Sequence, residues 1–234
     1  MEIKSFGSSS SGNCYLISDG SSKLLLECGI NIKKLKEQGV KLSEINACLI
    51  THEHLDHAKY ANSLTKYCTL ISSMGTLLAL GLSGNFNTMS TKEGDIFVVG
   101  SFKIIAFKVQ HDAKEPLGYL IHSSVTDETL LFATDTYYLA NKFSGLTHIM
   151  IECNYAEDIL EKNLKNGRVG KFLARRLVES HFSLQNVKKF LQENDLSKLK
   201  EIYLLHLSDG NSDEVRFKKE IQELTGVPTY VMKK

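Results

Sequence analysis

The sequence predicts an α/β protein whose sheets pack together with helices on the outside. Short apolar runs of strand length fill the first half of the chain, and in the second half such runs alternate with helical patterns. The 234 residues contain no repeat and no linker long enough to divide them. We therefore expect one domain over residues 1–234, which is large enough to bury its own core.

Turn residues separate the elements of the first half. The predicted strands cover residues 3–6, 14–17, 23–27, 47–51, 68–71, 95–99, 102–109, 118–122 and 129–133. The predicted helices cover residues 32–38, closed by Gly39, then residues 59–66 and 75–82. Gly100 and Ser101 have the length of a two-residue hairpin turn.

The second half continues with strands and longer helices. Strands are predicted over residues 148–152 and 201–205, and a helix over residues 170–179. A second helix opens at Ser183, a good N-cap, and carries an apolar stripe at Leu184, Val187, Phe190 and Leu191. The last helix starts at Ser212.

Composition and cysteine usage are those of an ordinary soluble protein. Hydrophobic residues make up 42% and charged residues 24% of the chain. No apolar run reaches the length of a membrane span and no signal peptide is recognisable, so we expect a cytoplasmic protein without a membrane partner. The five cysteines include no CxxC pair and lie in apolar contexts, which predicts buried, reduced thiols.

Charge is distributed unevenly, although the net charge is only +1. Between Glu161 and Phe190 there are eight basic residues, Arg175 and Arg176 among them, and two acidic residues. Such a run is most often a solvated helix face, and the functional alternative is a patch that binds phosphates.

The strongest local signal is the stretch Thr51-His52-Glu53-His54-Leu55-Asp56-His57, which starts where a predicted buried strand ends. His52 and His54 project to the same side of an extended backbone, and Asp56 and His57 follow at the turn into a helix. Imidazole and carboxylate ligands suit Zn²⁺, Mn²⁺ or Fe²⁺ rather than Ca²⁺. A solvated histidine-rich turn is the alternative, and the position after a buried strand favours a metal site.

Three further candidate ligands follow predicted strands. His111 comes after residues 102–109, Asp135 after residues 129–133 and His206 after residues 201–205. Each could be a polar residue at the edge of the core. Together they could complete the ligand set that a two-metal site needs.

The order His-x-His-x-Asp-His, a later His, a later Asp and a final His resembles the metallo-β-lactamase fold superfamily over nearly the whole chain. The resemblance implies a four-layer αββα sandwich with two divalent ions at one edge of its sheets. It implies that His52, His54 and His111 hold the first ion. It further implies that Asp56, His57 and His206 hold the second ion, with Asp135 bridging the two.

Within this superfamily the chain is similar to the YycJ (WalJ, VicX) group of bacterial hydrolases. The similar segments are GSSSSGNCYLI, LITHEHLDH, HDAKEPLGYLI, ATDT and LLHLSDGNSDE. The resemblance implies double-stranded DNA exonuclease activity. Two features depart from the pattern: residues 80–92 match nothing in the group, and Glu27 stands where many members have Asp. We expect Glu27 to support the metal loop from behind.

The serine run near the N-terminus has the composition of a flexible linker. In the superfamily, however, the first hairpin loop borders the metal cleft, so the resemblance favours a substrate-binding loop over a passive turn. Hydroxyl, amide and backbone N–H groups there could bind phosphate oxygens. The candidates are Ser9, Ser10, Ser11 and Asn13.

A proton-transfer pair is suggested by two further segments. Glu152 ends the strand 148–152, and His181 lies just before the helix opened by Ser183. These segments resemble the paired Glu and His loops of the tRNA 3′-end-processing nucleases of the superfamily. The resemblance implies that His181 is a general acid and that Glu152 orients it and raises its pKa. The structural alternative is a surface histidine and a capped strand end.

These features predict a hydrolase of phosphodiesters that uses two divalent ions, Zn²⁺ or Mn²⁺, and acts on nucleic acid, with DNA favoured. A hydroxide that bridges the ions would attack phosphorus. Asp56, Glu152 and His181 would serve catalysis, and Arg175 and Arg176 would guide the nucleic-acid backbone. The alternatives are a hydrolase of a cyclic phosphodiester, thioester or lactam, and a metal-binding regulatory module without turnover. The sequence predicts no oligomeric state.

Overall fold

A computed structural model describes residues 1–232, and in it the chain divides into two compact units. Unit 1 comprises residues 1–108 and 113–128, and unit 2 comprises residues 109–112 and 129–232. The single domain expected from the sequence stays a prediction, and each unit is described by itself.

Unit 1 contains a six-stranded sheet. Its strands, in spatial order, are β1 (Glu2–Ser9), β2 (Gly12–Ser18), β3 (Lys23–Leu26), β4 (Ala47–Leu49), β5 (Thr69–Ser73) and β6 (Thr88–Thr91). β1, β2 and β3 pair antiparallel, whereas β3 to β6 pair parallel, with Leu26 opposite Leu49. All residues of β4 are buried, as is typical of a central parallel strand with both faces covered.

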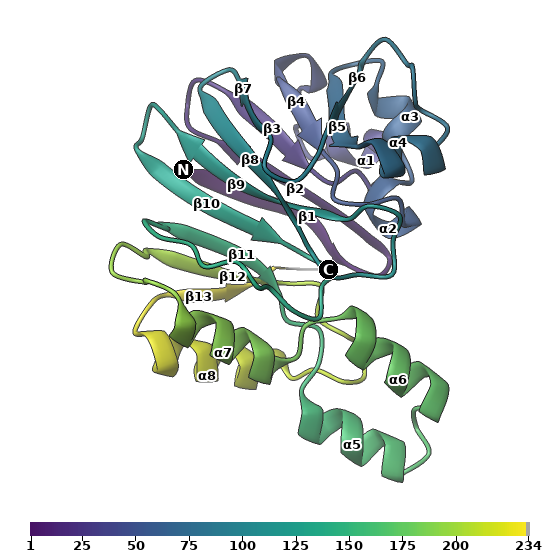
Figure 1. Cartoon of the computed structure of the whole chain (residues 1–234), viewed down its shortest axis with the longest axis vertical. Helices are drawn as coiled ribbons and strands as arrows, with labels where there is room; N and C mark the ends of the chain where they lie inside the picture. Colours follow the sequence, from purple (N-terminus) through teal and green to yellow (C-terminus); the bar gives the residue numbers. More distant parts are fainter. Residues whose placement is uncertain (233–234) are drawn as a thin grey trace. The chain divides into compact units, whose positions relative to one another are not determined.

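Helices cover one face of this sheet. They are α1 (Ile32–Glu37), α2 (Leu55–Ala58), α3 (Ala61–Leu64) and α4 (Met74–Ala79), and a 3₁₀ turn spans Leu42–Glu44. Figure 1 shows α1, α3 and α4 grouped beside the parallel strands. Their buried leucines share one apolar core with side chains of the sheet. This core includes Leu35, Leu64, Leu77, Leu25, Cys48 and Leu70.

The predicted state of the cysteines is confirmed. All five are buried and none forms a disulfide. Burial raises the pKa of Cys68 to about 12, so its thiol stays protonated at neutral pH.

A second group of strands completes unit 1. β7 (Ile96–Val99), β8 (Phe102–Lys108) and β9 (Leu117–Ser123) pair antiparallel. The hairpin predicted at Gly100 and Ser101 joins β7 to β8 and is confirmed. Its Gly100 has a φ of 57°, a conformation that glycine adopts without strain.

Unit 2 contains four parallel strands and four helices. The strands are β10 (Glu128–Ala133), β11 (His148–Glu152), β12 (Glu201–Leu205) and β13 (Thr229–Val231), paired in that order. The helices are α5 (Glu157–Lys165), α6 (Lys171–Ser180), α7 (Leu184–Glu193) and α8 (Glu214–Thr225). In Figure 1, α7 and α8 lie side by side next to β12 and β13, and α5 and α6 form a separate hairpin. Because the strands are parallel, their carboxyl ends meet at one edge.

Several sequence expectations differ from the structure in their bounds. The helix expected over residues 59–66 is shorter, because Tyr60 is not helical and separates α2 from α3. Residues 80–92, which matched no pattern, contain the edge strand β6. The N-cap at Ser183 is confirmed, since its hydroxyl accepts a hydrogen bond from the Asn186 N–H at 3.1 Å. In residues 1–232, no helix is both long enough and apolar enough to cross a membrane.

Candidate active site

The histidine motif forms a compact loop at the end of β4 in unit 1. Its side chains converge because the chain leaves the strand at Ile50 and enters α2 at Leu55. The ring of His52 lies 4.6 Å from that of His54 and 4.3 Å from that of His57, measured between centroids. Three imidazoles and the Asp56 carboxylate are therefore gathered within one short loop.

Glu27 supports this loop from its buried side, as we expected from the sequence. It is fully buried, with a φ of 65°, and accepts a hydrogen bond of 2.6 Å from the Thr51 hydroxyl. That hydroxyl lies 2.9 Å from Nδ1 of His52. Because its only proton goes to Glu27, it accepts from Nδ1–H of His52, which leaves the Nε2 lone pair for an ion.

The same carboxylate reaches a second histidine. Glu27 Oε1 lies 3.5 Å from Nδ1 of His57. Burial raises the pKa of Glu27, and the contacts with His57 and Thr51 offset only part of that effect. Glu27 thus connects two candidate ligands, His52 through Thr51 and His57 directly, and all of these contacts are buried.

Asn13 supports the loop from β2. Its side-chain amide donates to Asp56 Oδ2 at 3.3 Å and lies 3.1 Å from Nε2 of His57. Asn13 is fully buried, so its amide contacts the candidate ligands and not solvent. Gly29 closes the arrangement: its N–H donates to the Asn13 carbonyl, and a Cβ at Gly29 would lie 1.7 Å from the Asp56 carbonyl oxygen.

The serine run belongs to a β-hairpin in unit 1. Ser9 pairs with Gly12, so Ser10 and Ser11 form the exposed two-residue turn between β1 and β2. Ser9 is buried, and its hydroxyl accepts a hydrogen bond from the Ser11 N–H. The run is therefore an ordered turn that leads directly to Asn13.

Unit 2 gathers a second cluster at the carboxyl ends of its parallel strands. Asp135 follows β10, Glu152 ends β11 and His206 follows β12. Asp135 and His206 have φ values of 44° and 52°, an uncommon conformation for residues other than glycine. With His181, these residues bring their ligand atoms within 4.8 Å of one another.

Glu152 holds two histidines of this cluster. Its Oε1 accepts from Nδ1 of His181 at 2.6 Å and lies 3.0 Å from Nδ1 of His206. Its Oε2 accepts from the backbone N–H groups of Thr136 and Phe182 at 3.1 Å. The sequence pointed to the contact with His181, while the contact with His206 was not foreseen.

The charges of this pair reinforce each other. Burial alone would raise the pKa of Glu152, but the neighbouring His181 lowers it below its usual value. Burial would lower the pKa of His181, but the Glu152 carboxylate, with a smaller contribution from Asp135, raises it. His181 is thereby favoured in its protonated form.

His111 also lies in unit 2. Its Nδ1 lies 2.9 Å from the Ser180 carbonyl oxygen, and its Nε2 lies 3.7 Å from Asp135 Oδ2. A carbonyl can only accept, so Nδ1 carries the proton and Nε2 is left as a ligand atom. Burial lowers the pKa of His111, which keeps the imidazole neutral, as a metal ligand must be.

The donor groups fit divalent metal ions. Asp135 and Glu152 are buried close together, and carboxylates in such a place need a compensating positive charge. Imidazole nitrogens with fixed tautomers stand beside them. This mixture suits Zn²⁺, Mn²⁺ or Fe²⁺.

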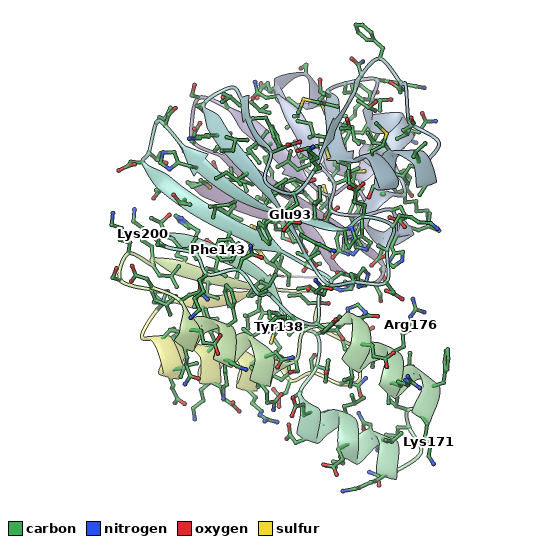
Figure 2. The ribbon with its side chains drawn as sticks, viewed as in Figure 1. Glu93, Tyr138, Phe143, Lys171, Arg176 and Lys200 are labelled. Atoms are coloured by element: carbon green, nitrogen blue, oxygen red, sulfur yellow. The ribbon has the colours of Figure 1, made fainter. Side chains whose placement is uncertain are left out.

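The two predicted arginines lie on α6 in unit 2. Arg175 is 79% exposed at its side chain and binds Glu179 at 2.8 Å, whereas Arg176 is 58% exposed and lies 3.4 Å from Asp112. Figure 2 shows Lys171 at the start of α6 and Arg176 nearer the end that leads to His181.

Sequence comparisons connect the chain with named proteins. It is 30% identical over 223 residues to the exodeoxyribonuclease WalJ of Streptococcus pneumoniae, covering 88% of this chain and 81% of WalJ. It is 28% identical over 225 residues to the exodeoxyribonuclease YycJ of Bacillus anthracis, covering 89% and 83%. Residues 4–78 match the model of the anti-Pycsar protein Apyc1 family.

Solved structures share the fold. The metallo-β-lactamase fold protein YhfI of Bacillus subtilis has a TM-score of 0.76 at 15% identity and covers 99% of this chain and 95% of YhfI. Zn²⁺-bound PqqB of Methylobacterium extorquens has a TM-score of 0.74 at 13% identity and covers 100% and 98%. The predicted α/β fold of the metallo-β-lactamase type is confirmed. The chain therefore belongs to the family of WalJ and YycJ, metal-dependent hydrolases of the metallo-β-lactamase fold.

Proposed function

We propose that the protein is a two-metal-dependent phosphodiester hydrolase and, like the relatives named exodeoxyribonucleases, digests DNA from an end. The observation that carries the proposal is the buried Glu152 carboxylate, which holds His181 and His206 by their Nδ1 atoms. One carboxylate thereby orients a candidate metal ligand and a candidate proton donor. A hydrolase that must protonate a leaving oxygen needs both.

The ligand set follows the family order of motifs. One ion would be held by His52, His54 and His111. The other would be held by Asp56, His57 and His206, with Asp135 bridging. This assignment is supported by the tautomers of His52, His111 and His206, whose Nδ1 atoms face acceptors, so that Nε2 is the ligand atom. When bound, two Zn²⁺ or Mn²⁺ ions would supply an activated water and stabilise charge on the phosphate.

His181 would donate the proton to the leaving oxygen. Its side chain is 17% exposed, while its partner Glu152 is fully buried. Nδ1–H bonds to Glu152, so Nε2–H is the group that can face a substrate. The charge of Glu152 raises the pKa of His181, which favours the form that carries this proton.

Substrate contacts are assigned by exposure. The turn residues Ser10 and Ser11, with the backbone near Ser9, would bind phosphate oxygens, and Arg175 and Arg176 would contact the nucleic-acid backbone. We place Asn13 differently from the sequence expectation. Because it is buried against Asp56 and His57, it would position these ligands and not touch the substrate.

The test is digestion of end-labelled DNA and RNA, double- and single-stranded, by the purified full chain with Mn²⁺, Zn²⁺ or chelator. We expect stepwise loss of nucleotides from a DNA end with metal and none with chelator. Turnover of a cyclic nucleotide or thioester without DNA digestion would instead establish a small-molecule hydrolase. Bound metal without turnover of any substrate would indicate a regulatory module. The cytoplasmic location expected from the sequence stays a prediction.

A further inference from the structure

One face of α6 lines a groove in unit 2 whose aromatic residues, Phe172 and Tyr137, have no role in the proposed chemistry. The groove has a volume of about 690 Å³. Its α6 residues are Phe172, Arg175, Arg176, Glu179 and Ser180. This spacing of i, i+3, i+4, i+7 and i+8 is one continuous stripe along a helix.

The stripe ends at a candidate metal ligand. The Ser180 carbonyl is the group that lies 2.9 Å from Nδ1 of His111, and His111 itself lines the groove. A molecule that lies along α6 would therefore reach the catalytic cluster of unit 2 at the Ser180 end.

Two aromatic side chains border this path. Phe172 is 85% exposed and Tyr137 is 39% exposed. The backbone of Tyr137 is fixed on both sides, because its N–H donates to the Gln110 carbonyl at 3.1 Å and its carbonyl accepts from Asn186 at 3.2 Å. An exposed phenylalanine and a tyrosine whose backbone is held in place, both lining the groove, are well suited to contact flat, apolar ring faces.

The arginines alone do not make the groove a strong site for phosphates. Arg175 is paired with Glu179, and Arg176 lies near Asp112, so each guanidinium already has a carboxylate partner. Exposed pairs of this kind contribute little to stability, and each arginine keeps further N–H donors for a phosphate. The aromatic rings are therefore the main binding groups of the groove, and the paired arginines add weaker contacts with phosphates.

We propose that this groove binds an unpaired strand of the nucleic-acid substrate, with Phe172 stacking on one of its bases and Tyr137 contacting a neighbouring base. The inference rests on the proposed function, because it takes the occupant to be the strand that His181 helps to cleave. Stacking on aromatic side chains is the usual way in which proteins bind single strands without reading their sequence.

The helix geometry gives the register of this contact. Phe172 and Ser180 are eight residues apart, which is roughly 12 Å along an α-helix. Stacked bases rise about 3.4 Å per nucleotide. Phe172 would therefore meet the third or fourth nucleotide from the phosphate at the catalytic cluster.

The experiment uses the metal-loaded full chain and a phosphorothioate-linked DNA oligonucleotide, which resists cleavage. A single 2-aminopurine is placed in turn at each of the positions nearest the unpaired end, and its fluorescence reports stacking. We expect quenching to be strongest at the third or fourth position. Phe172→Ala should remove that quenching and weaken binding by roughly 5- to 150-fold, the range expected for loss of one stacked base.

Matched variants separate stacking from other effects. Phe172→Trp should restore the quenching, whereas Phe172→Leu, which keeps an apolar side chain without a ring, should not. Phe86→Ala is the control, because Phe86 is 98% exposed and lies in unit 1 outside the groove. Because each arginine contacts at most one phosphate, Arg175→Ala and Arg176→Ala should each change the slope of log affinity against log salt by no more than about 0.7.

Three outcomes would overturn the inference. Equal quenching in the wild type and Phe172→Ala would show that Phe172 does not stack. Full recovery by Phe172→Leu would show a general apolar contact. A change of oligomeric state in Phe172→Ala, measured by light scattering, would show that α6 is a contact between copies of the chain.

If the wild type digests DNA in any of these cases, the proposed function stands and only the groove assignment fails. If the wild type neither binds nor digests DNA, both fail.

Discussion

The two units build their candidate ligand clusters in opposite ways. In unit 1, the ligands come from one stretch between His52 and His57, and buried partners from other strands clamp its backbone. In unit 2, they come from positions scattered between His111 and His206, and the register of parallel strands brings them together. A contiguous loop should therefore fail as a whole when its backbone is disturbed. A dispersed cluster should lose one function at a time when a side chain is removed.

The largest effect is expected from His181→Ala in unit 2. Loss of a positioned proton donor should slow turnover of DNA by roughly 10²–10⁴-fold, while both ions remain bound. A nitrophenolate ester, whose leaving group needs no proton, should be turned over at nearly the wild-type rate. Equal slowing on both substrates would make His181 a phosphate ligand. His122→Ala serves as the control, because His122 belongs to unit 1 and contacts Asp127.

Gly29→Ala should disrupt the whole loop of unit 1. Its new methyl group would lie 1.7 Å from the Asp56 carbonyl, so the loop must move. We expect a loss of about 1–3 kcal/mol in the free energy of unfolding, together with reduced metal content by elemental analysis. Gly170→Ala is the matched control, because a Cβ there meets nothing within 4 Å. Normal metal content in Gly29→Ala would contradict the clamp.

Thr51→Val tests a single link of the same clamp. The variant keeps the shape of the side chain and removes the hydroxyl that connects Glu27 with His52. Metal affinity should fall by roughly 10- to 100-fold, as is usual when a partner of a ligand is lost. Thr51→Ser should restore most of it. Unchanged affinity in competition with a chelator would mean that the hydroxyl does not orient His52.

Glu152→Gln should change the pH profile of turnover. The Glu152 charge raises the pKa of His181 against the opposing effect of burial, so its removal lowers that pKa. His181 would then lose its proton at a lower pH, and the alkaline limb of the profile would move down. The maximal rate should fall by roughly 10-fold, less than in His181→Ala. An alkaline limb that stays in place would separate Glu152 from the proton donor.

The smallest effect concerns a carboxylate of unit 1 outside the clusters. Burial would raise the pKa of Asp19, but hydrogen bonds from Ser101, Ser123 and the backbone of Ser21 and Ser22 lower it to about 2. A depressed pKa stabilises the folded state above the unfolded value of about 3.9, and this contribution is lost as the pH falls toward 2. The difference in melting temperature between the wild type and Asp19→Asn should therefore shrink between pH 4 and pH 2. A constant difference would show that the charge of Asp19 is not involved.

The sequence by itself determined the features that depend on neighbouring residues, namely the histidine motif, most of the strands and a helix N-cap. The candidate ligand loop was recognisable because His52, His54, Asp56 and His57 lie within six residues that follow an apolar strand. Strand periodicity placed β4, β11 and β12, and the N-cap at Ser183 was visible in the chain. The strand β6 escaped prediction, because the short edge strand Thr88–Thr91 carries no apolar run. The candidate pair Glu152 and His181 was recognisable only through resemblance to a known family.

Tertiary structure alone decided which distant side chains meet. Nothing near Glu152 indicates that it also binds His206, because that contact depends on the register of β11 against β12. Likewise, Asn13 was expected to face substrate, but the packing of β2 against the loop turns its amide toward Asp56 and His57. In the sequence, Phe172 cannot be distinguished from other apolar helix residues. Only the structure shows that its ring is exposed and lines a groove. Strands, helices and caps depend on residues that are adjacent in the chain. These contacts instead form between distant segments that meet only when the chain folds.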